Sequence, residues 1–111
     1  MYRHFSERIE EMIQGTTPTH TFQVPVDTGI IESVRIVYAQ NDVVVLTKEK
    51  DDCTFGDNRI AVKLSQEETF QFDDSFPVDI QIRLLTRGGD ALASRVERVP
   101  IITVLDGAVL E

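Results

Sequence analysis

From residue 19 onward, side chains that can be buried alternate with polar ones with a period of two, which is the pattern of half-buried β-strands. Three runs show this alternation most clearly, and each places one set of side chains on a single face. Those side chains are His20, Phe22 and Val24 in the first run, Ile60, Val62 and Leu64 in the second, and Val78, Ile80, Ile82 and Leu84 in the third. We therefore expect three strands with one buried side each.

Turn-forming residues separate the expected strands about every 8 to 12 residues. Hairpin turns are expected at residues 40–42, 56–58 and 87–90. The last apolar run, over residues 96–105, contains Pro100, which has no backbone N–H to give to a sheet, so this run is expected to be a broken edge strand. Ser65 and Glu68 have the spacing of a capping box, which predicts a short helical turn near residues 65–70.

The pattern gives seven or eight short strands and no helix long enough to connect parallel strands. It predicts an all-β protein, a single antiparallel β-sandwich of immunoglobulin-like size, with a small barrel as the alternative. Residues 1–14 break the period of two. Ser6 could cap a short helix there, with Ile9 and Ile13 on one face. We therefore divide the chain into an N-terminal extension or short helical arm over 1–14 and a sandwich domain over 15–111.

The net charge of the chain indicates which classes of partner it can bind. The 111 residues include 11 Lys and Arg against 19 Asp and Glu, a formal net charge of −8. Such a chain repels phosphate backbones and anionic headgroups, so we expect no nucleic acid and no membrane among its partners. No unbroken apolar stretch is longer than the four residues Val43–Leu46, which is too short for a membrane span or a signal-peptide core. The protein is expected to be cytoplasmic when made, without a signal peptide.

Residues that could carry out catalysis are sparse. Cys53 is the only cysteine and has no neighbouring His or Lys patch, and a histidine-dependent nucleophile would have to use His20, because His4 lies in the N-terminal segment. Adjacent acids occur at 51–52, 67–68 and 73–74, but none has the spacing of a dedicated calcium loop. We expect no enzyme activity, no cofactor, no metal and no catalytic residue.

Two features indicate association with other proteins. The hairpin over residues 34–46 is apolar on both faces, so Val37, Ala39, Val44 and Leu46 are candidate interface residues for another subunit. The alternative is that the N-terminal arm or the 65–77 segment covers them. Charge is also uneven, because Ser65–Asp79 holds five acids and no base whereas Arg83–Arg98 holds four arginines against two acids. Opposite patches suit head-to-tail packing of copies, and ordinary solvated surface is the alternative.

Three stretches, at residues 12–22, 62–70 and 80–94, resemble small uncharacterised proteins encoded in phage and prophage regions of Gram-positive bacteria. The layout is more distantly similar to the immunoglobulin-like N-terminal domain of phage baseplate and receptor-binding proteins. That domain often opens with a Gly-Asp-Thr turn, where this chain has Gly15, Thr16 and Thr17. The resemblance covers about residues 12–110. It implies a structural or adaptor role in a virion and assigns no functional residue.

The expected function is that of a non-enzymatic, prophage-encoded structural or accessory protein of a virion, of tail or baseplate type. It would act through protein partners, either further copies of itself in a homo-oligomer or other virion components. The alternative is a carbohydrate- or calcium-binding β-sandwich module. That alternative predicts an exposed aromatic platform or converging carboxylates. The aromatic residues would come from Phe55, Phe70, Phe72 and Phe76, and the acids from Asp51, Asp52, Asp73 and Asp74.

Overall fold

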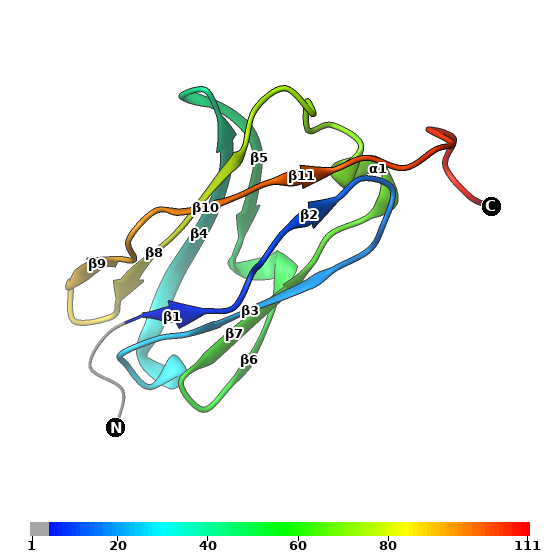
Figure 1. Cartoon of the computed structure of the whole chain (residues 1–111). Coiled ribbons are helices and arrows are strands. Elements are labelled where there is room, and N and C mark those ends of the chain that lie inside the picture. The colour runs from blue at the N-terminus through cyan, green and yellow to red at the C-terminus, as the bar shows by residue number, and fades with distance from the viewer. Residues whose placement is uncertain (1–4) are drawn as a thin grey trace.

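The computed structural model describes residues 5–111, which form two facing β-sheets (Figure 1) and a separate pair of short parallel strands. One sheet has the strand order β1-β3-β7-β6, and the other has the order β10-β8-β4-β5 with β9 paired to β8. Neighbouring strands within each sheet are antiparallel. The first sheet consists of β1 (Ser6–Glu7), β3 (Thr19–Gln23), β7 (Arg59–Lys63) and β6 (Cys53–Gly56). The second consists of β10 (Glu97–Val99), β8 (Val78–Thr86), β4 (Ile31–Gln40), β5 (Val43–Glu49) and β9 (Ala91–Ala93). The all-β sandwich expected from the sequence is confirmed.

The strand order matches a known topology. With the strands lettered along the chain, the first sheet is A-B-E-D and the second is G-F-C-C′, which is the arrangement of immunoglobulin sandwiches. The G position is divided into short pieces, because β9 and β10 pair with different parts of β8. The core lies between the sheets and is built by the alternating side chains. Its largest fully buried members are Tyr38, Phe22 and Phe72.

The prediction of a short helix near the N-terminus is wrong for residues 5–14, the part of this segment that the structure describes. Two short strands take its place, and the first, β1, pairs with β3. The chain then leaves the first sheet, and β2 (Met12–Ile13) pairs in parallel with β11 (Ile101–Ile102), which follows β10 of the second sheet. Met12 is fully buried and Ile9 packs against the core, so these residues belong to the sandwich rather than to a separate arm. Burial against both sheets outweighs the weak helical preference of so short a segment. Residues 1–4 lie outside the described part.

The predicted hairpin of β4 and β5 is confirmed, with one irregularity. Asn41 and Asp42 both have positive φ, of 49° and 63°, as the tightest hairpin turns require. The register shifts between Tyr38 and Ala39, which pair with Leu46 and Val44, so Val45 is an extra residue on β5. This β-bulge interrupts the alternation of side chains along β5.

The predicted capping box forms α1 (Gln66–Thr69), in which the Ser65 hydroxyl accepts from the Glu68 N–H and the Glu68 carboxylate accepts from the Ser65 N–H. Two short 3₁₀ turns, η1 (Thr28–Ile30) and η2 (Lys50–Asp52), connect strands. The loop after α1 is held by the buried Gln40. Its amide donates to the carbonyls of Asp73 and Phe76 and accepts from the Asp73 N–H, at 2.6, 2.9 and 2.8 Å.

Candidate functional site

The side of β4, β5 and β8 that faces away from the first sheet is here called the outer face. Cross-strand pairing defines its members, because residues directly opposite each other point to the same side. Val37 lies between Thr47 and Gln81, and Ala39 lies between Val44 and Asp79. Three of the four residues predicted as an interface, Val37, Ala39 and Val44, are thus neighbours on this face, and Val44 is 58% exposed.

Leu46 does not share the outer face with the other three. It pairs with Tyr38, whose side chain is fully buried, and it packs against the core. The cause is the bulge at Val45, which shifts the alternation of β5 by one position. The 65–77 segment contacts the buried side of the hairpin rather than the outer face, and the described residues of the N-terminal segment pair with other strands. β1 and β2 pair with β3 and β11, and the 65–77 segment contacts Gln40 and Tyr38.

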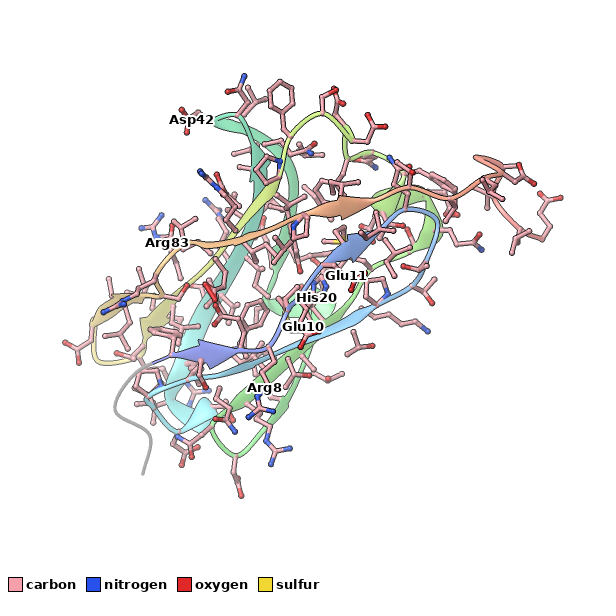
Figure 2. The ribbon with its side chains drawn as sticks, viewed as in Figure 1. Arg8, Glu10, Glu11, His20, Asp42 and Arg83 are labelled. Carbon is pink, nitrogen blue, oxygen red and sulfur yellow. The ribbon has the colours of Figure 1, made fainter. Side chains whose placement is uncertain are left out.

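A shallow depression of ≈ 260 Å³ lies on the outer face, toward the end of the hairpin that is distant from the β4–β5 turn. Arg35 pairs directly with Arg83 on one side and with Glu49 on the other, and all three side chains are exposed. Leu85 and Ala91 add apolar lining. Figure 2 shows Arg83 pointing away from the two sheets. From the sequence, Arg83 was predicted only as one of four arginines in residues 83–98, and Arg35 was not predicted as a site residue, although both occupy outward positions of alternating strands.

The β4–β5 turn and the loop before β8 lie at the same end of the sandwich (Figure 1). Residues 41–43 and 73–77 are here called the end surface. Gln40 holds its two parts together, because it pairs with Val43 in the sheet and binds the Phe76 carbonyl with its side chain. Val43 is 64% and Phe76 39% exposed. The end surface also carries three exposed acids, which are Asp42, Asp73 and Asp74.

His20 and Tyr38 form a buried polar pair between the sheets. His20 Nδ1 lies 2.7 Å from the Tyr38 hydroxyl oxygen, and the Tyr38 ring also packs on Phe72. The pair occupies strands B and C of the topology, where antibody domains place a disulfide cysteine and a tryptophan. Burial lowers the pKa of His20 to about 4 and raises the pKa of Tyr38 far above its usual range, with smaller contributions from Cys53 and Glu68 to the latter. Both groups are therefore neutral near pH 7 and act as structural elements linking the sheets.

Cys53 and the ion pair of Lys48 with Glu68 lie near this polar pair, at the edge formed by β5 and β6. Lys48 Nζ is 2.6 Å from Glu68 Oε2, which ties β5 to α1. Burial, together with the charge of Asp52, raises the pKa of the Cys53 thiol to about 11, although Lys48 acts in the opposite direction. A thiol that stays protonated near neutral pH is a poor nucleophile.

The residues proposed for a ligand-binding module do not converge. Phe72 is in the core, and Phe70 packs against Gly15. Phe55 lies on β6 at one sheet edge, while Phe76 lies in the end surface. Asp52 accepts from the Glu49 N–H in η2, and Asp73 accepts from the Ser75 N–H. Within residues 5–111, no three His, Cys, Asp or Glu side chains gather as a metal-holding group.

No protein-family model matches the sequence, and no curated protein matches it either. The class of the protein rests on its fold alone, which is an all-β sandwich with immunoglobulin strand order. Over residues 5–111, every helix is too short to span a bilayer.

Proposed function

We propose that the protein is a non-enzymatic structural or accessory component of a phage particle, of tail or baseplate type, and that it acts through contacts with other proteins. The observation that carries this proposal is the exposure of apolar side chains at one end of the β4–β5 hairpin, namely Val43 and Phe76 on the end surface and Val44 on the outer face next to it. Apolar side chains gathered in this way are typical of surfaces that other proteins cover. The resemblance of the sequence to small prophage proteins is the reason for proposing a phage particle as the place where these contacts form.

The interior of the protein supports a non-enzymatic role. The Nδ1 atom of His20 is engaged by Tyr38, and the side chain is only 4% exposed. Cys53 carries a protonated thiol whose Sγ donates to the Glu49 carbonyl. A solvent-accessible, activated nucleophile would instead need a lowered pKa and an adjacent base.

The test is made in the phage or prophage that carries the gene. Particles are purified by density gradient and analysed by mass spectrometry, and the gene is deleted in frame. We expect the protein in the particles, or a loss of intact particles on deletion. A protein that is missing from purified particles, in a strain whose particle yield and infectivity are unchanged by the deletion, contradicts the proposed function.

A pair of matched substitutions links this result to the surface. Val44→Asp introduces a charge among the exposed apolar residues at this end of the hairpin, and Val96→Asp makes the same change at an equally open position, since these valines are 58% and 54% exposed. Complementing the deletion with Val44→Asp should reduce incorporation or particle yield several-fold, whereas Val96→Asp should restore it. Equal behaviour of the two variants contradicts the role given to the apolar surface.

A further inference from the structure

The depression on the outer face has an excess of positive charge in a chain whose net charge is −8. Arg35 and Arg83 are directly opposite each other on β4 and β8, and Glu49 is the one carboxylate among the lining residues. Both salt bridges formed within residues 5–111 involve other arginine and lysine side chains. Like charges placed opposite each other on neighbouring strands repel. A carboxylate supplied from outside the chain would relieve that repulsion.

The depression also offers apolar contact. Leu85, which is 37% exposed, and Ala91 line it beside the two guanidinium groups. A partner segment that fits this lining carries both carboxylates and an apolar side chain, because an interface core is apolar and its rim is polar.

The 73–77 loop of the same chain has this composition. Asp73 and Asp74 are exposed, and Phe76 is exposed beside them. Of the five acids between residues 65 and 79, Glu68 and Asp79 have partners within the chain, namely Lys48 and Arg98. The remaining three, Glu67, Asp73 and Asp74, are not part of these pairs.

The loop is held in a defined conformation before it meets a partner. Gln40 makes three hydrogen bonds to its backbone, and the Asp73 carboxylate accepts from the Ser75 N–H at 2.8 Å. Hydrogen bonds from the backbone and the side chain of Ser75 lower the pKa of Asp73, so this acid is charged at neutral pH. A loop that is already ordered loses less entropy on binding.

The loop and the arginine pair lie at opposite ends of the β4–β5 hairpin. Gln40, which binds the loop, is the last residue of β4 before the turn, whereas Arg35 pairs with Glu49 at the far end of β5. The two surfaces therefore meet only between copies.

We propose that the 73–77 loop of one copy docks in the Arg35–Arg83 depression of a second copy. Asp73 and Asp74 face the guanidinium groups, and Phe76 adds apolar contact. Because the two surfaces differ, the contact is heterologous and extends into a ring or an open chain of copies. This inference rests on the proposed function and names the partner as a second copy of this chain.

The test is sedimentation velocity of the full chain over a wide concentration range. The contact predicts self-association at about 0.01 M salt, where charges act over roughly 30 Å, and its weakening at about 1 M salt, where they act over roughly 3 Å. The double variant Arg35→Glu/Arg83→Glu should lower the association constant about tenfold or more, since attraction becomes repulsion at both positions. Arg59→Glu/Arg87→Glu is the matched control, because it makes the same change of net charge at two exposed arginines that do not line the depression.

The loop is tested separately with Asp73→Asn/Asp74→Lys. The asparagine keeps an acceptor for the Ser75 N–H while removing the charge, so the loop retains its hydrogen bond. This variant should also lose self-association, and Asp57→Lys, in the β6–β7 turn of the other sheet, should not. Thermal melting of each variant shows whether it is folded, and Arg35→Gln/Arg83→Gln replaces the glutamate version if that version is unfolded.

Mixing gives the decisive result. The face variant retains an intact loop and the loop variant retains an intact face, so an equimolar mixture should regain association that neither variant shows alone. A wild-type protein that stays monomeric at low salt, or a mixture that stays monomeric, overturns the inference. A monomer that is nevertheless found in purified particles contradicts only this contact, whereas a self-associating protein that is absent from particles and dispensable for them contradicts only the proposed function.

Discussion

The buried histidine makes the stability of the protein depend on pH in a definite direction. Burial lowers the pKa of His20 from 6.5 to about 4. Between these values the unfolded chain binds a proton at this residue and the folded protein does not. Neutral His20 therefore leaves the folded protein at its full stability above pH 6.5. The free energy of unfolding then decreases as the pH falls from 6.5 toward 4.

The size of the effect follows from the difference between the two pKa values. Each pKa unit corresponds to about 1.4 kcal/mol. A shift from 6.5 to about 4 is then worth about 3 kcal/mol when the loss is complete, and linkage places about 2 kcal/mol of it above pH 5. A small domain is stable by only about 5–15 kcal/mol, so the loss is large enough to measure.

The assay is urea unfolding at a series of pH values from neutral to about pH 4, carried out on the wild type and on His20→Gln. A glutamine at this position can accept a hydrogen bond from the Tyr38 hydroxyl but does not titrate. His4 is present in both proteins, so the difference between their unfolding free energies isolates His20. Titration of the His20 ring protons by NMR gives the folded-state pKa directly.

The pH dependence assigned to His20 is wrong if the difference between the two proteins is the same at pH 7 and near pH 4, or if the ring titrates with an ordinary pKa near 6.5. Acidic groups do not confuse the comparison. Glu68 and Asp79, whose pKa values are lowered, lose their stabilising contributions mainly at lower pH, and they do so equally in both proteins. The pKa of Glu68 is lowered by its hydrogen bonds to Lys48 and Ser65 despite its desolvation, and that of Asp79 is lowered mainly by Arg98.

Three further predictions concern other parts of the chain. Gly15→Ala should destabilise the protein by about 1–3 kcal/mol in urea unfolding, because φ is +74° there and a Cβ would lie 2.5 Å from the Phe70 ring; an unchanged midpoint contradicts this. Gln40→Leu should cost about 1–3 kcal/mol and increase proteolytic cleavage within residues 71–77, and unaltered cleavage would show that Gln40 does not hold the loop. Cys53 should react with iodoacetamide at pH 8 about a hundredfold more slowly in the folded protein than in urea, since its pKa is raised to about 11; equal rates contradict the burial of the thiol.

The strands with uninterrupted alternation were predictable from local patterns alone. Ile60, Val62 and Leu64 alternate without interruption, and all three are buried against the opposite sheet. The capping box at Ser65 and Glu68 was equally readable, because its partners are three residues apart. Such features depend on neighbouring residues, so the sequence contains all the information needed to recognise them.

Features that depend on register could not be predicted. Nothing in the amino-acid sequence of β5 identifies Val45 as the bulge residue that turns Leu46 toward the core. Arg35 and Arg83 become neighbours only when β4 and β8 are aligned, and His20 meets Tyr38 only across the gap between the sheets. The N-terminal strands were mistaken for a helix because two residues each are too few to show a period, and only burial of Met12 decides their position.

The parallel pairing of β2 with β11 has a mechanical consequence. Tension applied to the two ends of the chain pulls β2 toward its start and β11 toward its end, so the load runs along both strands in opposite directions. The hydrogen bonds from Met12 N to the Pro100 carbonyl and from Gln14 N to the Ile102 carbonyl, of 2.9 and 3.0 Å, are then sheared together rather than opened one after another. We expect single molecules pulled by their ends to rupture at higher force than molecules pulled so that β2 peels from β11, and equal forces would contradict this. The short strands that join the two ends thus act as a clamp when the protein is under load.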